Sequence, residues 1–487
     1  MDETKFAARI GAITKNLVKL SLFIFLASAA HAQESLPTIQ SNAGYVSVQQ
    51  GDKLSKNSWR LSPSLKPDVY KAMLLGGKPN KVTFITDLDS ISFEVEEGKH
   101  YDFIIKKGDE LCFTQIVGVR LVPDAVFDER YRKQHQDKIQ VDVPEVYELV
   151  NIAIAMTPTG IADRNLVYKD SDYYQRVRAW FDSSRTHPLL AALDKELRDY
   201  PSYYFNMKMD GFAFEYDKNG RIVQSKVFDR ASWGVVNTLR PFIDQLQSFS
   251  DTTNFRKFFR ENRKTYQQQI NFYRKVADIA EMKRWLERNF PSTHYDSYNI
   301  IFSPLVNGNQ SSIHFESNGF KELQPHVNFP YLEKKATQRS QVSEKSWNLA
   351  RGNILFTELN HGYINPEAEK YGERVANAIS HNDHWIGKMS AQNYQGVNIF
   401  NEYMNWALLT LRILDYVPAS EQKPLIEAVE NTMVNNRQFP QFVALDRFLI
   451  PLYKERRPGQ TVADLYPNII QWFEDNNVES LGSSASN

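Results

Sequence analysis

Two side chains able to do acid–base and metal chemistry, Glu358 and His361, lie three residues apart in the segment FTELNHGYINP, residues 356–366. On a helix, residues with this spacing share a face. The segment nearly matches the pattern His-Glu-x-x-His, in which two imidazoles hold a zinc ion and the glutamate accepts a proton from the metal-bound water. Glu358 stands at the position of the base and His361 at the position of the second imidazole. Thr357 stands where the first imidazole would be, and its short neutral hydroxyl is a poor zinc ligand.

A further carboxylate, Glu402, lies in the segment NIFNEYMNWALLTLRILD, residues 398–415. Between Ile399 and Leu414 the residues are apolar on nearly every side, with Glu402 as the only acid and Arg412 as the only base. This pattern predicts a buried helix. A carboxylate inside such a helix must be paired or coordinated, because burying it without a partner is costly.

The pair Asn401-Glu402 on a second helix, downstream of Thr357-Glu358-Leu359-Asn360-His361, is the arrangement by which gluzincins supply a third ligand. Over roughly residues 290–420 the chain therefore resembles a gluzincin (thermolysin-like) zinc metallopeptidase domain with a degenerate motif. It also resembles a group of uncharacterised exported bacterial proteins that share a domain of unknown function. The resemblance implies Glu358 as the catalytic base, His361 and Glu402 as zinc ligands, and a peptide or protein substrate. Thr357 departs from the family pattern, which leaves both metal binding and catalysis open.

Three further histidines are candidates for the missing ligand or for the cleft. His381 and His384 stand three apart in the segment SHNDHWIG, between the two motif helices. Either could complete the site, and the alternative is a polar loop with two solvated imidazoles. His314, in SIHFES, belongs to an alternating strand pattern that would point it into the cleft or leave it as a core histidine with its hydrogen bonds satisfied.

The pattern of helices and strands expected around these residues predicts an α+β fold. It consists of a small β-domain followed by a mainly helical, zincin-like domain with a short sheet. Short runs rich in Val, Ile, Phe and Tyr predict a small antiparallel sandwich or barrel over residues 43–125. Helical periodicity dominates residues 142–292, apart from an inserted hairpin over 203–224, whose aromatic residues either cover a strand face or line a sugar-binding surface. Residues 293–478 are predicted as the zincin-like domain. Within it, strands within 295–308 and 311–317 pair with each other, and a helix runs from Ser343 to a stop at Asn365-Pro366.

The first 32 residues have the composition of an export signal. Basic residues precede the apolar run LSLFIFLASAA, and the small-residue site Ala30-His31-Ala32 follows it. The apolar run is shorter than the roughly 20 residues that cross a bilayer. We therefore expect a cleaved signal peptide, a mature chain with no stable membrane span, and a periplasmic or secreted location.

Charge and cysteine content exclude other classes. Lys+Arg and Asp+Glu both number 58, so no net charge attracts the chain to nucleic acid, and no nucleic-acid partner is expected. Cys112 is the single cysteine, which excludes an intrachain disulfide and a cysteine-based zinc site. It lies in a strand-like run and is predicted to be a small core residue.

Three functions fit these patterns. The first is an exported metal-dependent hydrolase, a zincin-type peptidase with an altered first ligand. The second is a catalytically inactive protein of the same fold that binds a peptide or glycan or acts as a scaffold. The third is a structural protein in which Glu358, His361 and Glu402 form only a buried hydrogen-bonded cluster. Whether zinc is bound, which substrate is used and what oligomer forms are left open.

Overall fold

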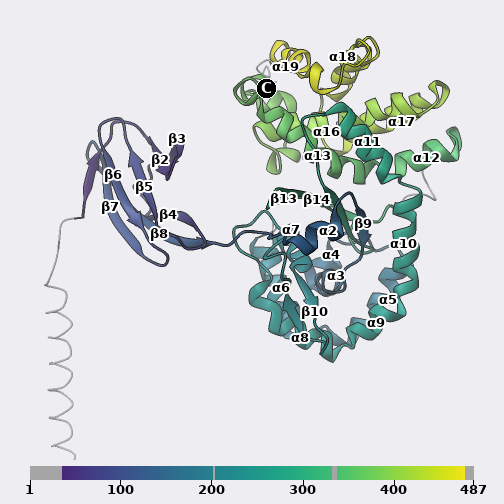
Figure 1. Cartoon of the computed structure of the whole chain (residues 1–487), viewed down its shortest axis with the longest axis horizontal. Helices are drawn as coiled ribbons and strands as arrows, with labels where there is room; N and C mark the ends of the chain where they lie inside the picture. Colours follow the sequence, from purple (N-terminus) through teal and green to yellow (C-terminus); the bar gives the residue numbers. More distant parts are fainter. Residues whose placement is uncertain (1–35, 201–202, 332–336, 478–487) are drawn as a thin grey trace, which may run out of the picture. The chain divides into compact units, whose positions relative to one another are not determined.

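The computed structural model describes residues 36–200, 203–331 and 337–477, and it divides the chain after Pro123 into two compact units. The first unit is rich in strands and the second is mainly helical with a short sheet, as the sequence predicts (Figure 1). The expected signal peptide, residues 1–32, lies outside the described residues. Across the described ranges, no helix combines the length and the apolar character that crossing a membrane would need.

The first unit contains two four-stranded sheets that share one hydrophobic core. Cys112 is buried in that core, as predicted. The expectation of a purely antiparallel unit is wrong, because β1 pairs in parallel with β7 and β4 in parallel with β8. One sheet has the order β1 (Thr38–Gln40), β7 (His100–Lys107), β8 (Glu110–Leu121), β4 (Asp68–Leu75), and the other has the order β3 (Lys53–Arg60), β2 (Tyr45–Gln50), β5 (Asn80–Ile85), β6 (Ser90–Val95).

In the second unit, one hydrophobic core extends from Ala125 to Phe473 and joins the two predicted regions 142–292 and 293–478. The helices that precede the last three strands of the main sheet are α2 (Glu129–His135), α3 (Glu145–Met156), α4 (Pro158–Ala162), α5 (Asp172–Phe181), α6 (Pro188–Asp199), α7 (Tyr203–Asp210), α8 (Ile243–Thr252), α9 (Phe255–Glu261), α10 (Arg263–Lys275) and α11 (Ile279–Asn289). Those that follow it are α12 (Glu344–Arg351), α13 (Asn353–Glu369), α14 (Gly372–Ala378), α15 (Asn382–Trp385), α16 (Val397–Tyr416), α17 (Ala419–Asn431), α18 (Phe442–Lys454) and α19 (Tyr466–Asp475).

The predicted hairpin over residues 203–224 is only partly correct. Its second half forms the pair β10 (Phe214–Tyr216) and β11 (Ile222–Gln224), but the first half is helix α7. Tyr204 and Met207, three residues apart, both face the core, which is a helical spacing that the aromatic content of the segment concealed.

The main sheet has the order β13 (Ser311–Ser317), β14 (Phe320–Asn328), β12 (Ser297–Ser303), β9 (Ile139–Asp142). The predicted pairing of β12 with β13 is wrong, because β14 lies between them. All seven residues of β12 are buried, as expected of a central strand with partners on both sides. β13 is partly exposed and forms the edge, antiparallel to β14.

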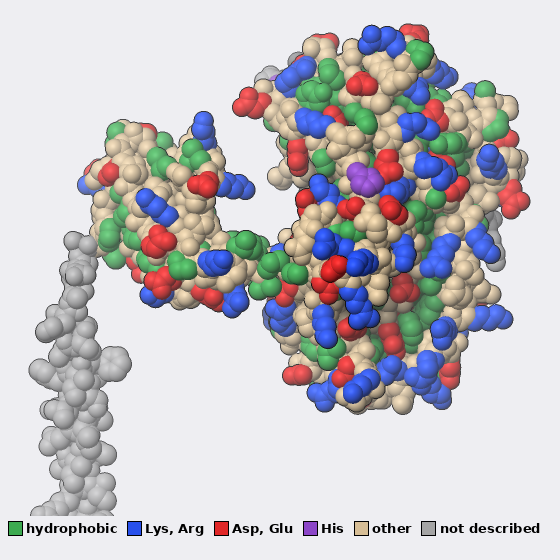
Figure 2. Space-filling model, viewed as in Figure 1, with side chains coloured by type: hydrophobic (Ala, Val, Ile, Leu, Met, Phe, Trp, Pro, Cys, Tyr) green, Lys and Arg blue, Asp and Glu red, His purple; other side chains and the backbone are tan. Residues whose placement is uncertain are grey.

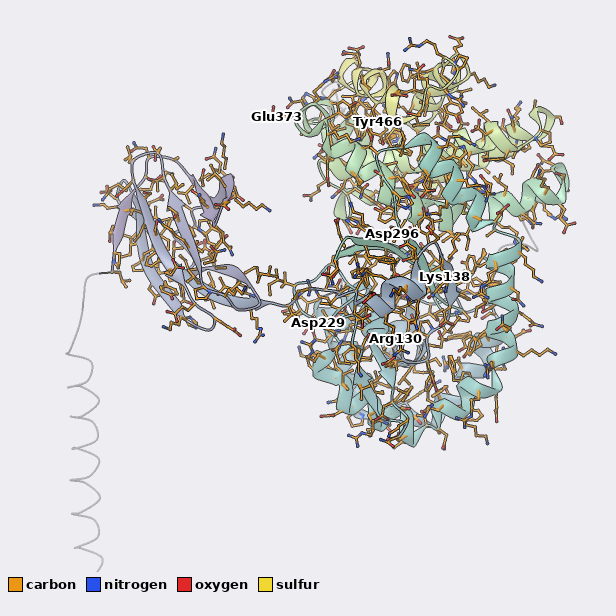
Figure 3. All side chains as sticks on the ribbon, in the orientation of Figure 1. Arg130, Lys138, Asp229, Asp296, Glu373 and Tyr466 are labelled. Carbon is orange, nitrogen blue, oxygen red and sulfur yellow. The ribbon has the colours of Figure 1, made fainter. Side chains whose placement is uncertain are left out.

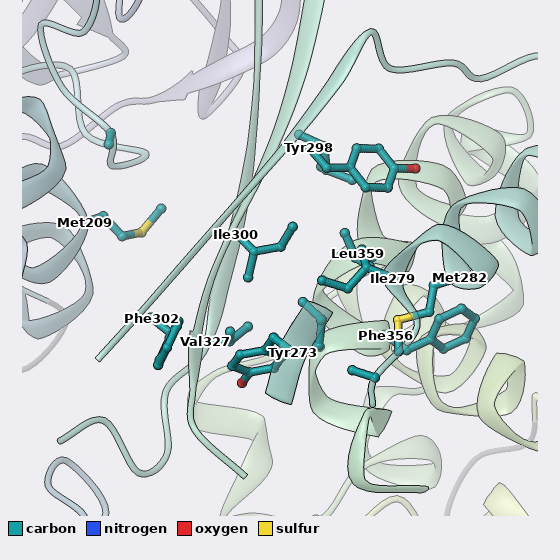
Figure 4. Close-up of a cluster of buried hydrophobic side chains, with 14 of the residues drawn as sticks. Met209, Tyr273, Ile279, Met282, Tyr298, Ile300, Phe302, Val327, Phe356 and Leu359 are labelled. Atoms are coloured by element: carbon teal, nitrogen blue, oxygen red, sulfur yellow. The ribbon is translucent and has the colours of Figure 1, made fainter. Parts of the chain in front are cut away.

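Helix α13, which carries the motif, packs on this sheet. Figure 4 shows Phe356 and Leu359 of α13 beside Ile279 and Met282 of α11 in the buried cluster that includes β12 and β14. At Gly362 the helix lies so close to the sheet that a Cβ would meet Leu323 Cδ1 at 2.9 Å. Glycine is therefore what allows the motif helix to lie against β14.

The predicted stop at Asn365-Pro366 is also wrong, since α13 continues to Glu369 with Pro366 inside it. Proline lacks the N–H that would bond to the carbonyl four residues earlier, which is that of Gly362. The hydroxyl of Tyr295 donates to that carbonyl at 2.8 Å and replaces the missing bond. The predicted continuous helix from Ser343 instead breaks at Gly352, between α12 and α13.

Candidate functional site

Helices α13 and α16 bring the predicted site residues together. Glu358 and His361 share a face of α13, and Glu402 lies on α16, which is buried from Ile399 to Ile413 as its sequence predicts. His361 Nε2 and Glu402 Oε2 are 3.7 Å apart. That separation satisfies the expectation that two ligands of one metal ion approach within about 5 Å. It leaves the roles of the two residues untested.

Glu402 already has a cationic partner, Arg437. The guanidinium of Arg437 forms a short hydrogen bond to Glu402 Oε1, and the indole of Trp406 donates to the same oxygen at 2.9 Å. Arg437 also donates to the hydroxyl of Tyr394 at 2.6 Å and lies 5.1 Å from the ring centre of Trp406. Burial opposes the charge on Arg437, but Glu402 and Tyr394 outweigh it and raise the pKa of Arg437. The buried carboxylate is thus paired, as its position in an apolar helix requires.

A short π-helix, η6 (Thr432–Asn436), leads directly into Arg437. Such segments are uncommon and often occur at functional sites. The carbonyl of Arg437 accepts a hydrogen bond from the hydroxyl of Ser390, and the next residue, Gln438, has a left-handed backbone with φ 55°. These features fix the main chain at the residue that carries the guanidinium.

Glu358 has a second cation near it, Lys208 of α7. Burial raises the pKa of Glu358 to about 7, and the charge of Glu402 adds to this effect, while His361, Lys208 and Arg437 oppose it. Burial lowers the pKa of Lys208 to about 7, and Glu358 opposes that shift. The ammonium of Lys208 donates to the carbonyl of Asn309 at 2.6 Å. Two carboxylates, Glu358 and Glu402, and two cations, Lys208 and Arg437, thus influence the charge at Glu358 from four separate segments of the chain.

The donors around His361 do not fit a zinc ion. A catalytic zinc site uses three protein ligands. Thr357 is buried, and its hydroxyl donates to the carbonyl of Ile354 at 2.8 Å. His361 Nε2 lies 2.8 Å from the side-chain amide nitrogen of Asn405, a donor that competes with a metal ion for the Nε2 lone pair. Within the described parts of the chain, no group of three or more His, Cys, Asp or Glu side chains is placed to hold a metal ion.

The other candidate histidines lie elsewhere. His381 donates its main-chain N–H to Asn477, and the ring of His384 packs against Trp385. His381 is the residue just before the short helix α15 and His384 lies within it, and no contact among the described residues connects either one to His361 or Glu402. His314 pairs with Leu323, so it lies on the face of the sheet that contacts α13, where its side chain is exposed.

Strand β13 presents a free edge beside this cluster. Ser312 lies opposite Pro325, which has no N–H, so the main-chain groups of Ser312 point away from β14. The carbonyl of Ser312 accepts a hydrogen bond from the indole of Trp233 at 3.1 Å. By the two-residue period of a strand, the main-chain groups of His314 and Glu316 point to the same outer edge.

Sequence reasoning missed Lys208, Arg437 and Asn405. The signal for Lys208 was present, because a single lysine stands between two buried methionines, Met207 and Met209. Arg437 gave no comparable signal, since it follows the mixed polar and apolar run TMVNN at a helix end. The chain matches no protein-family model, no curated protein sequence and no solved structure.

Proposed function

We propose that residues 124–477 form a peptide-binding module with a zincin-like arrangement, in which the guanidinium of Arg437 takes the place of a metal ion. The observation that carries the proposal is the hydrogen-bonded ion pair between Arg437 and Glu402. In a zincin, the motif would bind a zinc cation near His361 and Glu402. Here the chain supplies a positive charge beside Glu402 from its own residues. Of the functions that the sequence indicates, this geometry supports the non-catalytic binding module best.

The free edge of β13 supports a peptide as the ligand. An extended peptide can add a strand to such an edge, with main-chain hydrogen bonds giving affinity and side-chain contacts giving specificity. Among the described strands none pairs with the outer edge of β13, to which the main-chain groups of His314 and Glu316 point, and helix α13, which carries Glu358 and His361, packs against β13. Lys, Arg, Asp and Glu side chains are interspersed over the visible face of this unit, so no single sign of charge dominates that face (Figure 2).

Metal analysis and zinc titration of the purified chain test this proposal. We expect less than one zinc per chain and no zinc-dependent rise in the melting temperature of the wild type. Arg437→Met frees Glu402 from its cation and is expected to make zinc binding measurable, whereas the exposed control Arg374→Met is not. One tightly bound zinc per wild-type chain would overturn the proposal.

The metal-dependent peptidase is a second candidate, favoured by the pKa of about 7 at Glu358. A carboxylate poised near neutrality suits a general base. Zinc would reach His361 and Glu402 only if Arg437 moved away from Glu402. This candidate therefore predicts zinc-dependent hydrolysis of an unstructured protein such as casein, with Glu358→Gln abolishing the hydrolysis while leaving the zinc bound.

A further inference from the structure

The loop of residues 229–240 presents three large apolar side chains to solvent. Trp233, Val235 and Val236 are 56%, 46% and 54% exposed, and we call them the apolar tip. Single exposed apolar residues are ordinary, but three within four positions of one loop form a patch of the kind that marks interaction sites. Asp229, at the start of the loop, is labelled in Figure 3.

Hydrogen bonds to buried side chains hold this loop in one conformation. The carboxylate of Asp210, which is fully buried, accepts hydrogen bonds from the main-chain N–H groups of Ala231, Ser232 and Thr238 and from the hydroxyl of Thr238. The side chain of Asn237 accepts two further main-chain hydrogen bonds, from residues 239 and 240. The apolar tip is thus fixed in position before any ligand arrives, which lowers the entropic cost of binding.

The apolar tip is continuous with the edge of β13 and with the charged cluster. Trp233 donates to the carbonyl of Ser312, and its ring lies 6.0 Å from that of Phe205. Phe205 in turn packs against Lys208, whose ammonium lies 5.9 Å from the ring centre and which is coupled to Glu358. The apolar tip and the outward main-chain groups of β13 therefore lie together at the surface, and Phe205 connects the apolar tip to the buried Lys208.

We infer that the apolar tip selects extended peptides that carry a bulky apolar residue and add as a strand to β13. This inference rests on the proposed peptide-binding function. A strand paired with β13 lies about 4.8 Å from it, close enough for one side chain to cover the ring of Trp233. The Trp233 indole occupies the Ser312 carbonyl, so main-chain pairing begins at His314 and the apolar residue of the peptide lies beyond that end.

Selection from a phage-displayed library of random linear peptides tests the inference. Peptides of about ten residues are long enough to pair with β13 from His314 to its end and still reach the apolar tip. We expect the full chain to enrich peptides with Phe, Trp, Leu or Ile at one fixed position. A fluorescein-labelled selected peptide and its variant with serine at that position are then compared, and the serine variant is expected to bind at least about tenfold more weakly.

Variants of the protein separate the apolar tip from the strand edge. Trp233→Ala and Val236→Ser should each weaken binding of the selected peptide, the first by about tenfold. Each should also reduce the protein's preference for the selected peptide over its serine variant. Val223→Ser, at another partly exposed valine, should change neither. Trp233→Phe keeps the ring but frees the Ser312 carbonyl, and it should bind at least as tightly as the wild type. His314→Pro removes an outward N–H without touching the β14 pairing and should abolish binding of all the peptides.

The outcomes distinguish the two ideas. If His314→Pro abolishes binding while Trp233→Ala changes neither affinity nor preference, this inference is overturned and the peptide-binding proposal stands. If no peptide is enriched, or if His314→Pro has no effect, both fail. If the wild type is a dimer that Trp233→Ala converts to a monomer, the apolar tip binds a second copy of the chain, and the inference is overturned.

Discussion

Replacing Arg437 with methionine tests the pairing on which the site depends. The change keeps an unbranched stem against Trp406 but removes the charge that neutralises Glu402. The side chains of Arg437 and Glu402 are 28% and 5% exposed, so the carboxylate loses its cation in a largely dry environment. Breaking a buried pair typically costs about 3–5 kcal/mol. Because the Trp406 hydrogen bond remains and Arg437 is not fully enclosed, we expect a loss of roughly 3 kcal/mol.

A double-mutant cycle isolates this interaction. Glu402→Gln keeps an acceptor for Trp406 and removes the stranded charge, so adding it to Arg437→Met should recover most of the loss, with a coupling of about 2 kcal/mol. The pair Arg374–Glu474, whose side chains are 43% and 27% exposed, is the matched control, and Arg374→Met should cost less than about 1 kcal/mol.

Urea unfolding followed by tryptophan fluorescence measures these losses. Of the 8 tryptophans, only Trp59 precedes residue 124, so the signal reports mainly the second unit. If Arg437→Met costs no more than Arg374→Met, or if the coupling is below about 0.5 kcal/mol, Arg437 does not stabilise Glu402 and the charge-replacement argument fails.

Three further predictions concern the motif helix. The pKa of Glu358 is raised from 4.5 to about 7, so the folded state binds the proton of this carboxyl more tightly than the unfolded state does. The stability that the protonated carboxyl contributes should therefore fall by up to roughly 3 kcal/mol as the pH rises from 4.5 to about 7. Urea titrations at several pH values measure this slope, which Glu358→Gln should remove. Tyr295→Phe should cost about 1 kcal/mol in the wild type and less in a Pro366→Ala background, where the new N–H satisfies the Gly362 carbonyl; equal costs in both backgrounds would contradict this account of the helical proline. Gly362→Ala should lower stability by about 1–3 kcal/mol, since its Cβ would lie 2.9 Å from Leu323, and an unchanged unfolding midpoint would show that α13 does not need this close approach.

Local patterns in the sequence carried the prediction of the motif helices. The apolar character of residues 399–414 predicted that α16 is buried and that Glu402 must have a partner, and both are observed. The spacing of Glu358 and His361 predicted their common face. Features set by distant parts of the chain were not predictable. The insertion of β14 between β12 and β13, and the survival of α13 past Pro366, depend on packing and on a hydroxyl from Tyr295 that no local pattern encodes.

The difference between local patterns and contacts from distant segments also explains why the motif alone makes Thr357 look like a defect. When only the motif helix is considered, the missing imidazole suggests a damaged zinc site, because a metal ion at Glu402 would lack one of its ligands. Arg437 alters this interpretation of Thr357, because it gives Glu402 a permanent positive partner from a segment beyond α17. In the proposed arrangement this charge takes the place of a metal ion, so an imidazole at position 357 would have none to bind, and a small residue with its hydroxyl bonded to Ile354 fits the buried position. In the proposed metal-independent arrangement Thr357 and Arg437 are consistent with each other, and both should be changed in any attempt to build a three-ligand zinc site here.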